Sequence, residues 1–210
     1  MKIDKFVLGD FATNGYVLME PSASPACLVI DTGLAADDLT AFLKAESLRP
    51  EAVILTHGHV DHIAGFSEIR AQWPDVKLYV HKADAAMLTD AMANLSFLAG
   101  LSVELDRADV CLEHGQEITL AGIALKVLHT PGHTPGGISL YIPKAGVVFA
   151  GDTLFRESIG RTDFPGGDME TLLKGIRDHL FSLPDATVVY AGHGPETTIG
   201  HEKRHNPFVS

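Results

Sequence analysis

Cysteine is scarce in this chain of 210 residues, and the two that occur, Cys27 and Cys111, are widely separated. Two lone cysteines cannot build a disulfide framework, and they form no Cys-x-x-Cys metal or redox motif. Each lies in an apolar, strand-like stretch, so we expect both to be buried thiols.

Long apolar runs and a surplus of basic residues are also missing. No stretch approaches the roughly 20 apolar residues that span a membrane, and the charged start Met1-Lys-Ile-Asp-Lys5 does not resemble a signal peptide. Acidic side chains number 27 against 16 basic ones, for a formal net charge of -11, which opposes the binding of a polyanion. We therefore expect a cytoplasmic protein that binds neither membranes nor nucleic acid.

The apolar fraction is 46%, which is ordinary for a globular protein, and no linker divides the sequence. We expect a single α/β domain over residues 1–210. Apolar periodicity predicts strands at 3–8, 15–19, 27–30, 53–55, 76–80, near 110, and at 118–120, 123–128, 138–141, 147–149 and 187–190. It predicts helices at 35–48, 63–73, 83–93 and 169–181. This order predicts two sheets packed on each other with helices outside.

A dense group of potential metal ligands follows the apolar strand Val53–Leu55. It reads His57-Gly-His59-Val-Asp61-His62. Imidazole and carboxylate groups are ligands that divalent metals accept, and the glycine permits the backbone to bend around a cation. A metal site is favoured over the alternative, a solvated histidine-rich loop.

Three later segments each place one further candidate ligand beside glycine, just beyond a strand-like run. These candidates are His133, Asp152 and His193. With the first loop they bring the total to seven, whereas a structural zinc site usually has four ligands. The sequence therefore predicts more than one metal.

The ordered set of Asp31, the loop from His57 to His62, His133, Asp152 and His193 resembles the metallo-β-lactamase superfamily across nearly the whole chain. The resemblance implies a four-layer αββα sandwich of two mixed sheets with helices outside. It also implies that His57, His59 and His133 hold one metal, that Asp61, His62 and His193 hold the other, and that Asp152 bridges them. Asp31 would have a structural role, bonding backbone near the metal loop.

Two divalent ions per chain are implied, with zinc as the expected metal and iron or manganese as the other options. A hydroxide between them would be the nucleophile, because a divalent metal lowers the pKa of bound water from 15.7 to about 7. Asp61 would both bind metal and aim the hydroxide at a carbonyl carbon, which makes it the predicted catalytic residue.

Two segments are similar to the small bacterial hydrolases of the glyoxalase II, or hydroxyacylglutathione hydrolase, group: Gly160-Arg-Thr-Asp-Phe164, and the tail from Gly192 to Phe208. This similarity implies a small thioester substrate such as S-lactoylglutathione, and a role in methylglyoxal detoxification. Arg161 would bind a substrate carboxylate, unless it is a surface residue paired with Asp163 or Asp168. Lys203 and Arg204 are candidate glutathione contacts, since we expect no separate C-terminal helical substrate domain.

Two other functions remain open. The first is a mononuclear iron persulfide dioxygenase on the same fold, because the Gly-Arg-Thr-Asp-Phe segment is also similar to that branch. The second is a metal-binding module without catalysis, while β-lactamase action has no specific support beyond the shared metal loop. The apolar stretch Met92–Leu101 is expected to end a core helix rather than line the site or form a dimer contact. The oligomeric state is left open.

Overall fold

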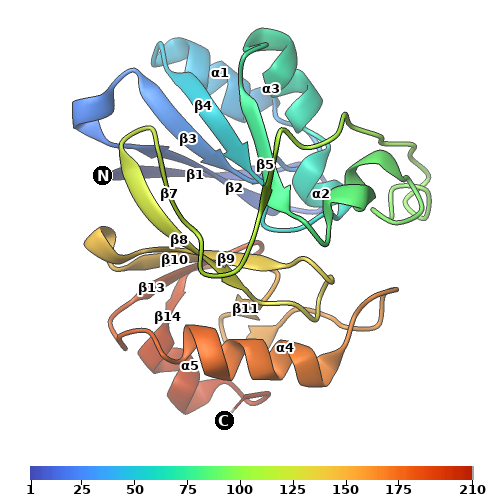
Figure 1. Ribbon diagram of the computed structural model, residues 1–210, viewed down its shortest axis with the longest axis vertical. Coiled ribbons are helices and arrows are strands. Elements are labelled where there is room, and N and C mark those ends of the chain that lie inside the picture. Colours follow the sequence, from blue (N-terminus) through green and yellow to red (C-terminus); the bar gives the residue numbers. More distant parts are fainter. Residues whose placement is uncertain (210) are drawn as a thin grey trace.

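The computed structural model describes residues 1–209, which form two six-stranded sheets packed face to face (Figure 1). Helices α1 and α3 cover the outer face of the first sheet, and α4 and α5 cover the outer face of the second. The four-layer arrangement predicted from the sequence is confirmed.

The first sheet has the strand order β1-β2-β3-β4-β5-β6. Strands β1 to β3 are antiparallel, whereas β3 to β6 are parallel. The strands are β1 (Lys2–Leu8), β2 (Thr13–Met19), β3 (Ala26–Ile30), β4 (Arg49–Ile54), β5 (Lys77–His81) and β6 (Val110–Leu112). The helices of this half are α1 (Asp37–Ala45), α2 (Val60–Ile63) and α3 (Phe66–Gln72), with the short 3-10 helices η1 (Pro21–Ala23) and η2 (Ala85–Thr89).

The second sheet has the order β14-β13-β10-β9-β8-β7, with β10 and β13 parallel and the other pairs antiparallel. Its strands are β7 (Glu117–Leu120), β8 (Ile123–His129), β9 (Ile138–Ile142), β10 (Val147–Gly151), β13 (Val188–Ala191) and β14 (Thr197–Thr198). The remaining elements are the hairpin β11 (Leu154–Phe155) and β12 (Ser158–Ile159), the 3-10 helix η3 (Pro143–Ala145), α4 (Met169–Gly175) with its π-helical continuation η4 (Ile176–Leu180), and α5 (Ile199–His205).

Three apolar layers hold these elements together. The central layer, between the two sheets, contains Leu18, Ile54, Leu140 and Phe149, all inaccessible to solvent. A second layer lies between the first sheet and helices α1 and α3, and a third lies beneath α4, η4 and α5. Full burial of a large apolar side chain stabilises the fold by about 1.5–3 kcal/mol, so the central layer fixes the two sheets against each other.

The helix predicted over residues 83–93 is wrong. This segment contains only the short 3-10 helix η2, followed by turns. Its polar side chains bind backbone groups that a helix would use: Asp90 accepts hydrogen bonds from the amides of Met92 and Ala93, and Asn94 donates to the carbonyl of Met87. Such local side-chain bonds compete with helix formation.

The helix predicted over residues 63–73 is divided, because the chain turns at Gly65 between α2 and α3. A Cβ atom at this glycine would lie 2.3 Å from the carbonyl oxygen of Thr32, so the close approach requires glycine.

Two further expectations differ from the structure. Cys27 is buried as expected, but Cys111 on β6 is exposed, and helix α5 has no counterpart in the sequence prediction.

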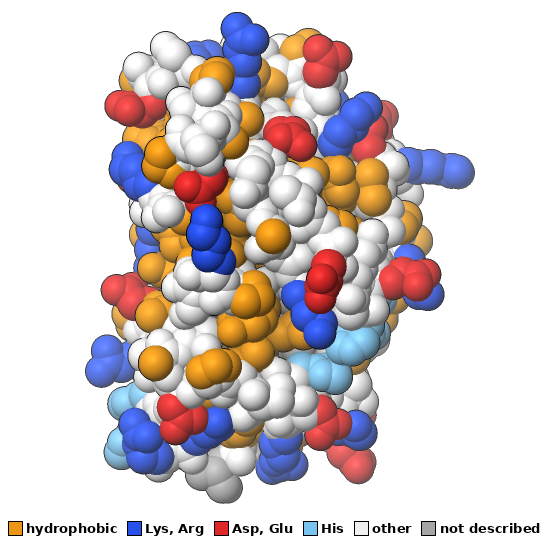
Figure 2. Space-filling model, turned by 60° about the vertical axis from the view of Figure 1, so that its left-hand side comes forward, with side chains coloured by type: hydrophobic (Ala, Val, Ile, Leu, Met, Phe, Trp, Pro, Cys, Tyr) orange, Lys and Arg blue, Asp and Glu red, His pale blue; other side chains and the backbone are white. Residues whose placement is uncertain are grey.

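Charged side chains of both signs are interspersed on the face shown in Figure 2, among scattered hydrophobic ones. Within residues 1–209, no helix has the length and apolar character needed to cross a bilayer.

Candidate metal centre

All seven candidate ligands lie at one edge of the sandwich, on segments that follow strands. His57 and His59 lie in the loop after β4, and Asp61 and His62 lie on the short helix α2. In the second half, the ligands are His133 between β8 and β9, Asp152 immediately after β10, and His193 shortly after β13. Strand ends therefore position ligands from both halves of the chain around one point, as is common for functional loops on a rigid scaffold.

The ligand atoms form three overlapping groups, and the group of His57, His62 and Asp152 links the other two. In one group, His57, His59 and His133 have ligand atoms within 4.8 Å of one another, and in the other the same holds for Asp61, His62 and His193. Asp152 Oδ1 is 3.4 Å from His62 Nε2, whereas its Oδ2 is 3.6 Å from His133 Nε2 and 3.5 Å from His193 Nε2. Its two oxygens therefore face both groups.

Unpaired buried atoms in this cluster fit a bound cation. His57 Nε2, His62 Nε2 and Asp152 Oδ1 are buried and have no hydrogen-bond partner. A buried polar atom left unpaired costs about 1–3 kcal/mol, so three in one cluster would be unfavourable without a further binding partner. A divalent cation among imidazole nitrogens and carboxylate oxygens would satisfy all three.

The electrostatic environment also favours cations. Burial and the neighbouring imidazoles lower the pKa of His57, and lower that of His59 to about 3, so both rings keep a free lone pair. Burial opposes ionisation of Asp61, but His62 and His193 outweigh it and hold the pKa of this carboxyl below its usual value. Burial likewise opposes protonation of His62, yet the carboxylates of Asp61, Asp31 and Asp152 raise its pKa. The site is thus rich in negative charge, and metal would compete with protons for it.

The cluster forms the floor of a pocket of about 450 Å³. Beyond the metal ligands, its lining is mostly apolar and includes Leu95, Leu98 and Ala99. These three belong to the segment Met92–Leu101, which was expected to end a core helix. That expectation is wrong, because the segment consists of turns and lines the pocket instead.

A family model of the metallo-beta-lactamase superfamily matches residues 9–193, a span that begins before the first ligand and ends at the last. The chain belongs to the metallo-beta-lactamase superfamily. It is 39% identical over 211 residues to the probable metallo-hydrolase YqgX of Bacillus subtilis, covering 100% of this chain and 98% of the relative. It is 34% identical over 212 residues to the hydroxyacylglutathione hydrolase GloC of Haemophilus influenzae, covering 100% and 99%.

Two solved structures of this superfamily are similar over nearly their full length. BLEG-1, described as a B3 metallo-beta-lactamase, superposes with a TM-score of 0.94 at 39% identity, with 100% of both chains covered. TTHA1623, in a di-iron-bound form, superposes with a TM-score of 0.86 at 36% identity, covering 98% of this chain and 99% of its own. The fold and the histidine-rich site thus indicate divalent metal binding by a metallo-hydrolase.

Within this superfamily site, Asp31 has the supporting role predicted for it. Its carboxylate accepts hydrogen bonds from the Thr56 amide and hydroxyl, each at 2.8 Å, and contacts His62 Nδ1 at 2.9 Å. The first two bonds fix the backbone at the start of the metal loop. The third orients the imidazole so that Nε2 faces the metal position, as carboxylate partners of ligating histidines commonly do.

Asp84 was not identified from the sequence, although it connects the two loops that hold one ligand group. Its buried carboxylate accepts from the Gly58 amide at 3.0 Å, the Thr134 hydroxyl at 2.7 Å and the Gly136 amide at 2.5 Å. Burial raises its pKa, against these hydrogen bonds. Its position three residues after β5, at the same sheet edge as the ligands, was the available signal, but the helix predicted there obscured it.

Strand β2 supplies three further supporting residues that the sequence did not reveal. The Thr13 hydroxyl donates to Asp61 Oδ2 at 3.1 Å. Asn14 Nδ2 donates to the carbonyls of Ala191 and Gly194, each at 2.9 Å, and the Tyr16 hydroxyl donates to the former at 2.6 Å. The contacts of Asn14 and Tyr16 hold the loop that carries His193, and that of Thr13 holds Asp61.

The three predicted substrate contacts lie in different places. Arg161 lines the pocket, where its Nε and Nη2 donate to Asp163 at 2.7 Å each and its guanidinium stacks 4.0 Å from the Phe164 ring centroid. Lys203 lies on α5, away from the pocket, and donates to Asp185 at 2.7 Å. Arg204 is an exposed residue of the same helix and does not line the pocket. The structure therefore brings only the first of them to the metal centre.

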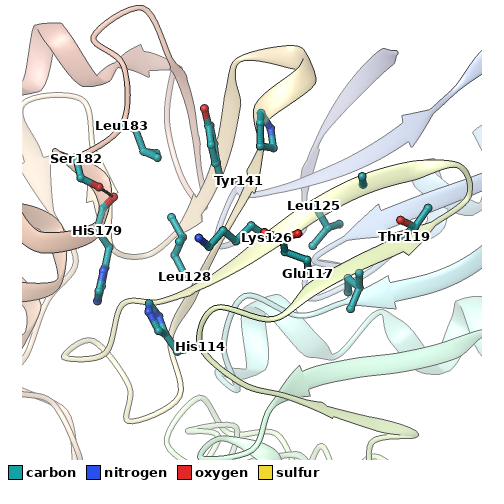
Figure 3. Close-up of a pocket in the computed structure, with 13 residues that line it drawn as sticks. His114, Glu117, Thr119, Leu125, Lys126, Leu128, Tyr141, His179, Ser182 and Leu183 are labelled. Atoms are coloured by element: carbon teal, nitrogen blue, oxygen red, sulfur yellow. Dashed lines mark hydrogen bonds between the residues drawn. The ribbon is translucent and has the colours of Figure 1, made fainter.

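A second cavity, of about 530 Å³, lies on the outer side of the second sheet, between β7, β8 and the end of η4 (Figure 3). Two imidazoles face each other there, His114 and His179, with ring centroids 4.6 Å apart. In the part of the chain that the structure describes, however, the groups with metal-ligand geometry all come from the seven residues above. This larger cavity therefore lacks the chemistry expected of a superfamily active site.

Proposed function

We propose that this protein is a thioester hydrolase of the glyoxalase II kind, using two divalent cations. The observation that carries the proposal is that Asp152 lies between two ligand groups at the floor of a pocket, with its oxygens facing histidines of both. Similarity to the hydroxyacylglutathione hydrolase GloC supports a thioester of a hydroxy acid, such as S-lactoylglutathione, as the substrate class. Zinc is the proposed metal, and similarity to a di-iron protein keeps iron as an alternative.

His57, His59 and His133 would hold one cation, Asp61, His62 and His193 the other, and Asp152 both. When bound, the cations would supply a water acidified towards neutral pH and a Lewis acid for the carbonyl oxygen. Asp61 would orient that water by accepting a hydrogen bond from it, and the Thr13 hydroxyl donates to Asp61 Oδ2 at 3.1 Å. Thr13 thereby holds the Asp61 side chain in one orientation.

The composition of the pocket supports a leaving group that departs without a proton. Apart from the metal ligands, the described pocket-lining residues include one ionisable side chain, Arg161, whose guanidinium stays protonated. A thiolate, with a conjugate-acid pKa near 8.5, can leave without a general acid, whereas an amide nitrogen generally requires protonation. A thioester therefore fits this pocket better than an amide.

Hydrolysis of a β-lactam is a second candidate, favoured by the similarity to BLEG-1. A β-lactam is an amide, and its nitrogen would have to take a proton from water, because the described lining residues other than the metal ligands include no group placed to donate one. The two candidates thus differ in the leaving group, which makes them separable in one assay.

The test is a comparison of S-lactoylglutathione, other hydroxyacyl thioesters and a chromogenic β-lactam on protein of measured metal content. We expect close to two divalent ions per chain, and a kcat/KM for the best thioester at least about a hundredfold above that for the β-lactam. Preference for the β-lactam would replace the proposal with the second candidate. One iron per chain, together with oxygen uptake on a persulfide, would replace it with the dioxygenase.

A further inference from the structure

We infer that the substrate of this site carries an apolar, uncharged arm beyond the scissile bond, and that the segment Met92–Leu101 recognises it. The inference rests on the proposed function and narrows it, because it concerns the part of the thioester that does not react. Glutathione, with two carboxylates and one ammonium group, would be a poor carrier on this view.

The first support is the composition of the pocket wall. Above the metal ligands, the lining residues are apolar except for one: they are Phe11, Val60, Leu95, Leu98, Ala99, Phe164 and Arg161. Side chains from four separate parts of the chain thus form one apolar surface next to the metal ligands. Such a wall binds hydrocarbon by removing it from water.

The second support is the distribution of exposed large apolar side chains. Nine such residues are found in the described chain, and five of them belong to the pocket wall or to Met92–Leu101. Leu98 and Phe97 are the most exposed, at 65% and 63%. An apolar concentration beside a catalytic pocket marks a binding surface, whereas apolar residues scattered singly do not.

The segment Met92–Leu101 is held in place by buried hydrogen bonds, so this part of the pocket wall has a defined conformation. Asn94 is inaccessible to solvent, and its side chain donates to the carbonyls of Met87 at 3.1 Å and Val103 at 2.8 Å. Its own carbonyl accepts from the amide of Val60, the first residue of α2, at 2.8 Å. Because α2 also carries Asp61 and His62, the apolar wall and the metal ligands are positioned by the same contact.

Charge gives the third support. Arg161 is the one cation among the described lining residues, and both Nε and Nη2 already donate to Asp163. Because the Asp163 carboxylate neutralises Arg161, this side chain offers little net positive charge to the carboxylates of glutathione. An uncharged arm does not need a cation in the pocket.

The arm could belong to the acyl group or to the thiol, so the test varies each in turn. One series keeps N-acetylcysteamine as the thiol and lengthens the acyl chain from acetyl to octanoyl. The other keeps a lactoyl group and compares neutral alkyl thiols of increasing length with glutathione. For a chain that becomes fully buried, kcat/KM should rise about threefold to fourfold per methylene, which corresponds to about 0.8 kcal/mol. The series that rises identifies the side carrying the arm.

Two variants provide the structural control. Leu98→Ala removes part of the pocket wall and should reduce the longest-to-shortest ratio of kcat/KM about tenfold. Met169→Ala truncates an exposed apolar side chain on α4 that does not line the pocket, and should change that ratio less than twofold. Calorimetric binding of the matching S-alkyl thioethers, which cannot be hydrolysed, gives a readout independent of turnover.

The outcomes separate the two proposals. If thioesters are hydrolysed but both series are flat, or S-lactoylglutathione is the best substrate, the apolar arm is wrong and the proposed function stands. If no thioester is hydrolysed, the proposed function fails, and thioether affinities that do not increase with chain length overturn the inference too. A wild-type dimer that Leu98→Ala converts to a monomer in sedimentation would also overturn it, because a second copy would then cover the wall.

Discussion

Two buried aspartates, Asp31 and Asp84, support the metal loop from opposite ends. The first binds the backbone of Thr56 at the start of the loop and orients His62, and the second binds the Gly58 amide and the loop that carries His133. Neither carboxylate needs to contact a cation in order to affect metal binding. Each fixes ligands that would otherwise have several backbone conformations available.

Asp84→Ala should lower both stability and metal affinity. It leaves three donors without their acceptor, each costing about 1–3 kcal/mol, so the free energy of unfolding should fall by about 3 kcal/mol or more. Zinc affinity should fall at least about tenfold, as for other outer partners of metal ligands. Urea denaturation and competitive zinc titration measure the two effects. Asp106→Ala, at a residue 85% exposed, is the control, and equal losses in both variants would refute the role of Asp84.

Asp61 and Asp152 look alike in sequence but should respond differently to substitution. Asp152→Ala should lower occupancy of both metals together, because its oxygens face both ligand groups. Asp61→Asn should keep the first metal and lose kcat by at least about a hundredfold, since it retains shape but not the charge that orients the attacking water. Metal analysis and thioester kinetics at saturating zinc decide, and a kcat near the wild-type value would show that Asp61 has no such role.

At this scale the sequence indicated residues that have distinctive chemistry and missed those whose importance comes from position. The histidine-rich loop stands out because few other uses require so many ligands in six residues. Thr13 and Asn14 are ordinary side chains, and they have a role only because β2 lies beside Asp61 and the His193 loop. Contacts between residues so far apart in sequence cannot be inferred from local pattern.

At the scale of elements, the strands were predicted best and the segment between β5 and β6 worst. Short apolar runs such as Val147–Phe149 are buried on both faces, and their composition alone identifies them. Between β5 and β6, the apolar spacing suggested a helix, but Asp90 and Asn94 bind backbone groups and produce turns. Helix α5 was missed because its charged sequence, Ile-Gly-His-Glu-Lys-Arg-His, shows little apolar periodicity.

The packing of the His133 loop on α4 leads to a prediction at the same scale. Gly132 has a φ of 125°, and a Cβ there would lie 2.4 Å from the backbone nitrogen of Leu172. Gly132→Ala should therefore displace the loop from the helix and reduce both stability and metal occupancy. Gly146→Ala is the matched control, with a φ of 65° and open space around the added atom, and should cost only about 1 kcal/mol. In denaturation experiments, the free energy of unfolding should fall at least twice as much for Gly132→Ala as for Gly146→Ala. Similar losses would mean that α4 shifts to accommodate the added Cβ at little cost.

For the molecule as a whole, the two-sheet sandwich follows from the alternation of strands and helices, while the way its loops meet does not. Local periodicity predicts which faces are apolar, and such faces must be buried against one another. The register between the sheets depends instead on the shape of the central apolar layer, including Leu18, Ile54 and Phe149. Periodicity carries no information about that fit.

Acid should destabilise the fold partly through His81, which is buried at the end of β5 and stacks on His129 at 4.0 Å. Burial, together with His129 and Lys82, lowers its pKa to about 4. Its ordinary value is about 6.5, so the unfolded chain takes up this proton first. Stability from this group is complete above about pH 6.5 and decreases as the pH falls towards 4.

The check is thermal unfolding of the wild type and His81→Gln from pH 7 to pH 4. The difference in Tm between them should shift in favour of the variant as the pH falls. His205→Gln, at an exposed site, should follow the wild type throughout. Parallel curves for the wild type and His81→Gln would assign the acid sensitivity to other groups.

The division of ligands between the two halves of the chain has a consequence for how the protein matures. The first half contributes four of the seven, but each group in the pair needs a histidine from the second half, His133 in one and His193 in the other. A nascent chain therefore cannot complete either site until its two sheets have docked. On the proposed two-metal arrangement, we therefore expect the pair to fill only after the sheets have docked, so the cations available at that stage would determine which metals are bound.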